Sequence, residues 1–264
     1  MTRGRTATVL TTTFDGDSST RRPDELVVEE PMAIHLDDHL VTTTMRTPGH
    51  DFELAAGFCF TDGLLAGAAV RTARYCGTGP ASETDFNVVS VDTGGRAPVP
   101  TPRLGTTTSS CGLCGSTSLT ELAERLEPIV ATHHFAADVL AGVPERVRAE
   151  QRLFDATGAV HAAAAFGPDG TPVVVREDVG RHNAVDKVVG HLLLEGRLPA
   201  SGLGLYVSGR ASFEMVQKAW AAGFAALVAV SAPTSLAVAT AERADLVLVG
   251  FVRGERMNLY AGTL

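Results

Sequence analysis

The stretch that decides the fold is residues 171–196, "TPVVVREDVGRHNAVDKVVGHLLLEG". Its Val-rich start predicts a strand, its charged middle predicts a loop, and its last half has the apolar spacing of an amphipathic helix. Residues 203–223 and 224–244 repeat this plan, and 245–262 adds a strand, a loop and a short strand. Continuous apolar strands that alternate with helices predict a largely parallel sheet covered on both faces.

Three polar loops follow these strands, and ligands of such sheets bind beyond the carboxyl ends of the strands. The loops are "REDVGRHN" (176–183), "SGRAS" (208–212) and "SAPTS" (231–235), and "FVRGERMN" (251–258) could join them. Taken one at a time, each loop is a routine helix cap or a charged turn. Taken together, their hydroxyl groups and backbone N–H groups indicate a cradle for a phosphate or a nucleotide.

Within the first of these loops, Arg181 and His182 are the expected donors to an anion. The alternative is a salt-bridged loop in which Asn183 caps the following helix. Near the C-terminus, Arg253 and Arg256 lie on either side of a glycine, and two guanidinium groups on one turn suit phosphate or guanine contacts. The alternative there is an ordinary charged hairpin turn.

The N-terminal part predicts a smaller unit of a different kind. Residues 26–36 alternate as a strand does, with Pro31 indicating an edge or a bulge, and 40–46 reads as its partner strand. Residues 47–65 predict a turn and a helix, and a further strand is expected around 86–91. Residues 1–22 lack periodicity, so we expect a disordered tail there.

The cysteine pair lies in "SSCGLCGS" (109–116), after a stretch rich in Gly, Pro and Thr (93–110) that predicts a linker or mobile loop. The residues that follow predict a helix, whose N-terminus would lower the pKa of a nearby thiol. Two glycines within the pair would let a partner approach closely. We therefore favour thiol chemistry over two idle cysteines.

A metal site is the main alternative for the pair, since structural zinc needs about four ligands. The other candidate ligands have no familiar zinc-finger spacing; they are His133, His134, Cys76 and His161. A zinc deaminase would also need Glu two residues after its His, before the Cys-x-x-Cys. Position 163 is Ala and the pair precedes His161, so deaminase chemistry is disfavoured.

The composition excludes several classes of protein. The 264 residues are 45% hydrophobic and carry a formal net charge of -8, so non-specific nucleic-acid binding is not expected. We find no signal peptide and no apolar run long enough for a membrane span. These features indicate a cytoplasmic protein, in which reduced cysteines are more often catalytic or metal-binding than structural.

Several long motifs together resemble the formate dehydrogenase accessory sulfurtransferase (FdhD) family. They occur in the family's order from about residue 25 to the C-terminus, and the C-terminal ones are "SSCGLCG", "VREDVGRHNAVDKVVG", "SGRASFEMVQKA" and "GFVRGERMNLY". "EEPMAIHL" and "TPGHDFELAAGF" resemble the family's N-terminal half. The resemblance implies an α/β fold with a cytidine-deaminase-like mixed sheet, helices on both faces, and a smaller N-terminal α+β domain. We place that domain at 23–104 and the deaminase-like sulfurtransferase domain at 105–264.

The resemblance also implies a function. Family members accept persulfide sulfur from a cysteine desulfurase and pass it to the bis-molybdopterin guanine dinucleotide molybdenum cofactor, which is bound as a substrate before its insertion into formate dehydrogenase. Cys111 matches the family's persulfide-bearing cysteine, and Cys114 matches a helper thiol. The family's cofactor-binding stretch maps onto Phe251, Val252, Arg253, Gly254, Glu255 and Arg256. Family members are dimers, so a homodimer without a metal of its own is expected.

Two other functions stay open at this point. The first is a chaperone that delivers the molybdenum cofactor without sulfur chemistry; its cysteines would be dispensable and its arginine loops essential. The second is a zinc-dependent hydrolase or deaminase, which would contain stoichiometric zinc. Tungsten in place of molybdenum is also open.

Overall fold

The structure is a computed structural model that describes residues 4–76, 86–102, 106–107 and 124–264. Its larger part is a six-stranded sheet with the order β13-β12-β11-β10-β8-β9. The strands are β8 (His161–Phe166), β9 (Pro172–Asp178), β10 (Gly204–Val207), β11 (Ala226–Ala229), β12 (Val247–Arg253) and β13 (Arg256–Ala261). The strand, loop and helix plan predicted for residues 171–262 is therefore confirmed.

The directions of these strands correct the expectation of a largely parallel sheet. Only β10–β11 and β11–β12 pair in parallel, whereas β8 is antiparallel to both of its neighbours and β13 is antiparallel to β12. The sheet is thus mixed, as the family resemblance implied. The strand pattern missed this because β8 runs in the opposite direction yet is as apolar as its neighbours, being buried on both faces.

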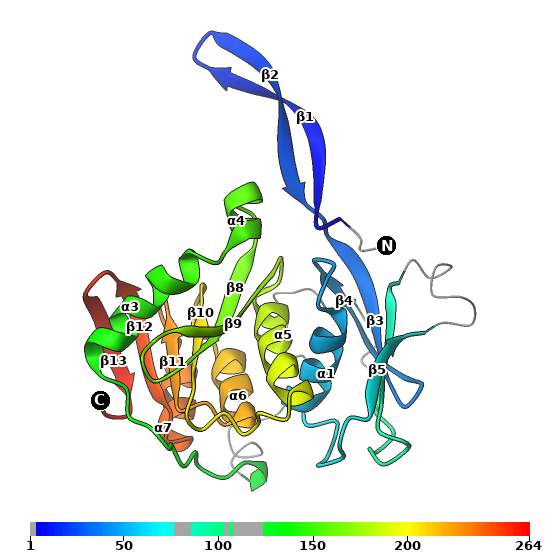
Figure 1. The fold of residues 1–264 in the computed structure, drawn as a ribbon, viewed down its shortest axis with the longest axis vertical. Helices are drawn as coiled ribbons and strands as arrows, with labels where there is room; N and C mark the ends of the chain where they lie inside the picture. Colours follow the sequence, from blue (N-terminus) through cyan, green and yellow to red (C-terminus); the bar gives the residue numbers. More distant parts are fainter. Residues whose placement is uncertain (1–3, 77–85, 103–105, 108–123) are drawn as a thin grey trace.

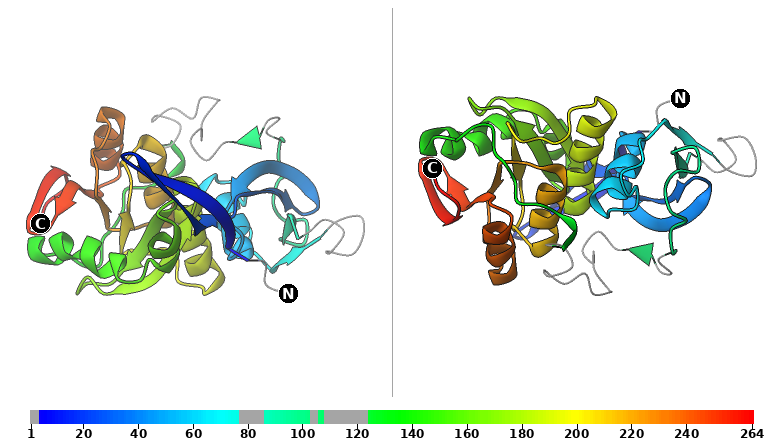
Figure 2. Two further views of the ribbon diagram at one scale, coloured as in Figure 1. Left: turned by 90° about the horizontal axis from the view of Figure 1, so that it is seen from above. Right: turned by 90° about the horizontal axis from the view of Figure 1, so that it is seen from below.

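Helices cover both faces of this sheet, as predicted (Figure 2). The helices are α3 (Ala137–Arg148), α4 (Arg152–Thr157), α5 (Arg181–Leu194), α6 (Phe213–Ala222) and α7 (Ser235–Arg243). The helices α5, α6 and α7 pack on one face in a core that includes Ala163 and Leu205. The helix α3 packs on the other face against Ala164 and Tyr206. Alternate residues of each strand thus enter opposite cores, as the pleat requires.

A smaller five-stranded sheet, with the order β5-β6-β3-β4-β7, forms the N-terminal unit together with one helix. Its elements are β3 (Glu30–Leu36), β4 (His39–Arg46), α1 (Asp51–Thr61), β5 (Thr72–Tyr75), β6 (Val88–Asp92) and β7 (Thr106–Thr107). The predicted hairpin, helix and later strand are all present. Pro31 lies where β3 pairs with β4 alone, because β6 joins β3 only from Ala33.

Most of the expected disordered tail instead forms a long hairpin of β1 (Thr6–Asp15) and β2 (Ser18–Val27), which we call the arm. Ten residues of each strand pair in antiparallel register, and Gly16 in the turn has a φ of 58°. Figure 1 shows that the arm rises away from the body of the molecule. The prediction failed because the arm's strands lack the apolar alternation that a strand packed on a core would have.

The two sheets are joined through α1 and α5, which lie side by side at the junction (Figure 1). A Cβ on Gly57 of α1 would lie 1.9 Å from the Asp186 carbonyl oxygen, and one on Gly190 of α5 would lie 1.8 Å from that of Glu53. Since these distances are far below van der Waals contact, two glycines let the helix backbones touch. Among the described residues, no helix is long and apolar enough to cross a membrane.

Candidate functional site

The carboxyl ends of four strands meet at one edge of the six-stranded sheet. Because β8 is antiparallel to both β9 and β10, those two strands point the same way, and β11 and β12 follow β10 in parallel. The loops after these four strands therefore lie at the same edge, together with the start of β8. We call this the loop edge.

Backbone contacts join three of the loops directly. Thr234 donates its N–H to the Ala211 carbonyl oxygen at 3.1 Å, and Ala211 forms an isolated bridge with Pro233. Phe251 donates its N–H to the Ser231 carbonyl oxygen at 3.2 Å. The loops predicted from "SGRAS", "SAPTS" and "FVRGERMN" thus form one continuous surface.

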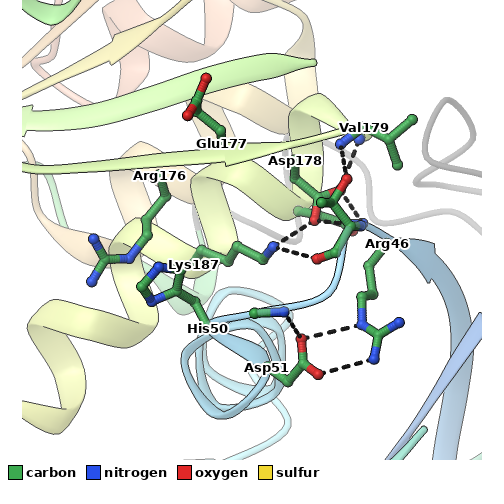
Figure 3. A network of polar contacts seen from close by, with 12 residues as sticks. Arg46, His50, Asp51, Arg176, Glu177, Asp178, Val179 and Lys187 are labelled. Atoms are coloured by element: carbon green, nitrogen blue, oxygen red, sulfur yellow. Dashed lines mark hydrogen bonds and ion pairs between the residues drawn. The ribbon is translucent and has the colours of Figure 1, made fainter. Parts of the chain in front are cut away.

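The loop after β9 is anchored to the N-terminal unit by Asp178, which is fully buried (Figure 3). One of its carboxylate oxygens lies 2.7 Å from Lys187 Nζ and accepts the Thr47 N–H at 3.1 Å. The other accepts the Gly180 N–H at 2.8 Å and an Asn183 amide N–H at 2.9 Å. Lys187 in turn donates to the Thr47 carbonyl oxygen at 2.9 Å. A single carboxylate thereby ties both units to the start of α5.

Asn183 does not cap α5, contrary to the alternative weighed above. Gly180 occupies the N-cap position and no side chain caps the helix. Asn183 lies in the first turn and donates to the Met45 carbonyl oxygen at 2.8 Å as well as to Asp178. Its amide is therefore a contact between the two units rather than a helix cap.

Other charged side chains of residues 176–187 also form ion pairs and hydrogen bonds at the junction between the two units. Asp186 lies 2.7 Å from Lys218 of α6 and accepts the Thr61 hydroxyl at 2.8 Å. Arg176 donates to Glu53 of α1 at 2.7 Å. Burial acts to raise the pKa of Glu53, but Arg176 and then His50 lower it to about 2. The salt-bridged interpretation thus holds for most of "REDVGRHNAVDK".

Arg181 and His182 differ from the rest, because they lie at the loop edge where α5 begins. His182 Nε2 lies 3.8 Å from a carboxylate oxygen of Glu214, which also accepts the Ser212 hydroxyl at 2.7 Å. His182, as the largest influence, and Ser212 lower the pKa of Glu214 to about 2 against the effect of burial. Arg181 lies near Gly209, since a Cβ there would be 3.8 Å from Arg181 Cδ.

The structure places His161, considered above only as a possible zinc ligand, at the loop edge where β8 begins. Its Nδ1 lies 3.4 Å from the Ser208 hydroxyl oxygen, which accepts the Ala162 N–H at 2.9 Å. Burial first, and then the neighbouring Arg181 and His182, lower the pKa of His161. Ser208 follows β10, which is antiparallel to β8, and only this order of the strands brings Ser208 to His161.

The predicted cofactor-binding stretch 251–256 spans the turn between β12 and β13. Val252 is 1% exposed, and its side chain packs in the core under α3. Phe251 is 45% exposed with a φ of 53°, and Gly254 has a φ of 56°. The side chains of Arg253, Glu255 and Arg256 are exposed.

One side of this turn borders a groove of about 520 Å³ against α3. The groove is lined by Gly254, Glu255 and Met257 of the turn and by Asp138 and Glu145 of the helix, among others. Three carboxylates repel an anion, so this groove does not suit a phosphate. A phosphate held by the turn would instead lie toward the loop edge.

Cys111 and Cys114 lie outside the described residues. The last residue described before them is Thr107 in β7, which pairs with Thr44 of β4. The Thr44 hydroxyl in turn donates to the Asn183 amide oxygen at 3.4 Å. Within the described ranges, no group of three His, Cys, Asp or Glu side chains is placed to hold a metal ion.

Comparison with known proteins gives the chain its family. The FdhD/NarQ family matches residues 27–263. A protein named sulfur carrier protein FdhD from Nocardia farcinica is 52% identical over 247 residues, which is 92% of this chain and 88% of that protein. One of the same name from Streptomyces coelicolor is 51% identical over 256 residues, covering 94% and 90% of the two chains.

A solved structure supports the same relationship. It is described as a formate dehydrogenase accessory protein from Desulfotalea psychrophila, with a TM-score of 0.75 and 25% sequence identity. The similarity covers 98% of each chain. On these matches, which span nearly the whole sequence, the chain belongs to the FdhD/NarQ family.

Proposed function

We propose that this chain is a cytoplasmic sulfurtransferase that carries sulfur on Cys111. It accepts persulfide sulfur from a cysteine desulfurase and transfers it to the bis-molybdopterin guanine dinucleotide molybdenum cofactor, its substrate, before insertion into formate dehydrogenase. The observation that carries this proposal is the identity of about half of all residues, over nine tenths of the chain, with proteins named sulfur carriers.

The chemistry requires one nucleophilic thiolate and a second thiol nearby. The Cys111 thiolate attacks the terminal sulfur of the desulfurase persulfide, and the desulfurase thiolate leaves. In the transfer onward, the acceptor would supply the electron pair for a new bond to the terminal sulfur, while the S–S bond breaks and Cys111 leaves as a thiolate. Cys114 can also attack Cys111 of the persulfide, which releases hydrosulfide and leaves a disulfide that a cellular thiol must reduce.

Chain connectivity supports delivery to the loop edge. Thr107 pairs with Thr44 in the sheet, and the Thr44 hydroxyl donates a hydrogen bond to the Asn183 amide oxygen at the start of α5. Cys111 is the fourth residue after Thr107, and four residues of extended chain span at most about 14 Å. The point from which the chain runs on toward Cys111 therefore lies beside the start of α5, which supports delivery of its sulfur to the loop edge.

The loop edge supplies groups that suit the anionic cofactor. Arg181 and His182 lie at the start of α5, where the helix dipole also favours negative charge. On the turn of 251–256, Arg253 and Arg256 offer guanidinium groups for the phosphates or the guanine. Because the chain is acidic overall, with a net charge of -8, such recognition depends on these local groups.

Formate dehydrogenase activity in a host that lacks its own copy of this protein tests the sulfur role. Cys111→Ala should abolish the activity, whereas Cys76→Ala, a free cysteine far along the chain from the pair, should support it as the wild type does. Full activity with Cys111→Ala would refute the sulfur role. If Cys111→Ala were active and Arg253→Ala inactive in the same assay, the two results together would favour a cofactor-delivering chaperone without sulfur chemistry.

Titration with guanosine diphosphate, which carries the guanine and phosphates of the cofactor, tests the binding role. Arg253→Ala should weaken binding by about tenfold, the loss of about 1.4 kcal/mol expected for one charged contact. Arg243→Ala is the matched control, because Arg243 lies in the last turn of α7, away from the loop edge. Equal binding by wild type and Arg253→Ala would remove this residue from the site.

A further inference from the structure

The groove between α3 and the turn of 251–256 has no part in the cofactor site proposed above, which lies toward the loop edge. Its volume is about 520 Å³. Figure 1 shows α3 alongside β12 and β13, at the end of the six-stranded sheet farthest from the N-terminal unit. Among the described residues, β13 pairs with β12 alone. A large partner can therefore approach the groove without meeting the N-terminal unit.

The rim of the groove is acidic. Asp138 and Glu145 line it from α3, Glu255 lines it from the turn, and all three side chains are exposed. Within the described part of the chain, none of these carboxylates forms an ion pair or a side-chain hydrogen bond. The lining contains no lysine, arginine or histidine from that part. Because the three negative charges repel one another, a cation that enters the groove is attracted.

The two arginines of α3 do not neutralise this rim, because both are bound elsewhere. Arg146 donates to the Asp169 carbonyl oxygen in the turn between β8 and β9. Arg148 forms an ion pair with Asp155 of α4. The charge of the rim is therefore available to a group from outside the described chain.

The floor of the groove is apolar. It consists of Ala137, Ala141, Gly142, Pro144 and Met257. A Cβ on Gly142 would have its nearest neighbour 3.9 Å away, so this part of the groove is open. Met257 is half-buried, and its unbranched side chain can adapt to an apolar partner. The groove thus suits a segment with an apolar centre and flanking positive charges.

The two carboxylates on α3 set the spacing of the charges that would match them. Asp138 and Glu145 are seven residues apart, so they lie on one face of the helix, about 10 Å from each other along its axis. Basic side chains two turns apart on a partner helix have the same spacing. An apolar residue between them would lie over Ala141 and Gly142.

We propose that this groove binds a basic segment of formate dehydrogenase, the enzyme that receives the cofactor. The inference rests on the proposed function. It is supported by the continuity of two surfaces, since Gly254 and Glu255 line the groove, while Arg253 and Arg256 of the same turn are the proposed cofactor contacts. A partner seated in the groove is next to the cofactor that it must take. The net charge of -8 adds a general attraction for a basic partner.

The position of the groove favours the acceptor of the cofactor over the donor of the sulfur. The chain runs on toward Cys111 from a point beside the start of α5, near the end of β9. The strands β8, β10 and β11 separate β9 from β12. Four strand spacings of about 4.8 Å put roughly 19 Å between β9 and β12. The groove is thus beside the cofactor turn and away from the point where the cysteine segment begins.

Binding of purified, cofactor-free formate dehydrogenase from the same organism to the full chain, measured by biolayer interferometry, tests this inference. Asp138→Lys combined with Glu145→Lys should raise the dissociation constant at least about tenfold, because like charges would then face each other. Added salt should weaken the wild-type complex more than the complex of this double variant. The matched control combines Glu195→Lys with Glu242→Lys, two exposed carboxylates on other helices, and should bind as the wild type does. An unchanged groove variant, or equal weakening by the control, would overturn the inference.

Gly142→Leu gives a second readout without a change of charge. Leucine favours the helical conformation, and its side chain would fill the open part of the groove, so this variant should also bind formate dehydrogenase more weakly. Binding equal to that of the wild type would contradict an occupied groove.

Sulfur loading by the desulfurase separates this inference from the proposed function. The groove variants should gain one sulfur atom as the wild type does. A wild type that gains sulfur but does not bind formate dehydrogenase would overturn the inference and leave the sulfur role intact. Groove variants that lose sulfur loading but keep formate dehydrogenase binding would assign the groove to the desulfurase, and this result would also overturn the inference.

Discussion

Asp186 and Lys218 show how single residues hold the two units together. Both side chains are nearly fully buried, and their charged atoms lie 2.7 Å apart beneath Thr61 of α1. Burial raises the pKa of Asp186, while Lys218 acts to lower it. Such a pair adds little stability compared with apolar residues, but breaking it leaves one charge uncompensated.

Lys218→Met should therefore lower the free energy of unfolding by about 3–5 kcal/mol, measured by chemical denaturation. Adding Asp186→Asn removes the unpaired buried carboxylate, so the double variant should recover part of the lost free energy of unfolding. A double variant less stable than Lys218→Met alone would contradict this account of the pair.

Glu53 gives the molecule a predictable response to acid. Its pKa falls from 4.5 to about 2 in the folded protein, so the unfolded chain binds more protons between these values. The stability that Glu53 contributes is present above about pH 4.5 and is lost as the pH falls toward about 2. Glu53→Gln should be less stable than the wild type at neutral pH, and the difference should shrink on acidification. A difference that stays constant across this range would contradict the assignment, and Glu195→Gln, on an exposed residue, is the control.

At the scale of elements, the contact between α1 and α5 depends on two glycines. Gly57→Ala would place a methyl group 1.9 Å from the Asp186 carbonyl oxygen, so the helices must move apart. We expect the free energy of unfolding to fall by about 1–3 kcal/mol. Gly142→Ala in α3 is the matched control, because the nearest atom to its Cβ, on the Arg146 side chain, is 3.9 Å away. That variant should gain roughly 0.5–1 kcal/mol from helix propensity, and equal effects of the two changes would refute the close contact.

Several elements were predictable from the sequence because their apolar spacing records their packing. The strands and helices of residues 171–262 were predicted, because each packs one or two faces against a core. The hairpin and helix of residues 26–65 were predicted for the same reason. The arm was not, because its strands are exposed on both faces and carry no such record. The antiparallel direction of β8 could not be predicted either, because a strand buried on both faces has the same apolar sequence pattern in either direction.

The candidate site was predictable in part for similar reasons. The sequence placed the loops at one sheet edge, and Arg181 and His182 lie there. It did not reveal that Asp178, Asp186 and Lys187 face the N-terminal unit, because their partners there lie 125 to 140 residues away along the chain. The contact of His161 with Ser208 was not predicted, because Ser208 is 47 residues away and is brought close only by the order of the strands.

At the scale of the whole molecule, the two units and the arm all converge on the loop edge. The N-terminal unit holds Thr107 there through β7, the buried carboxylate of Asp178 fixes the start of α5, and Arg5 anchors the arm to the end of β9. We therefore expect sulfur loaded on Cys111 to meet the cofactor at this edge.

The most direct test of that account is the intact mass of the protein after incubation with a cysteine desulfurase and cysteine. The wild type should gain the mass of one sulfur atom, the gain should be reversed by a reductant, and Cys111→Ala should show none. A wild type that gains no sulfur, or a Cys111→Ala variant that gains as much as the wild type, would contradict the proposed sulfur transfer through Cys111.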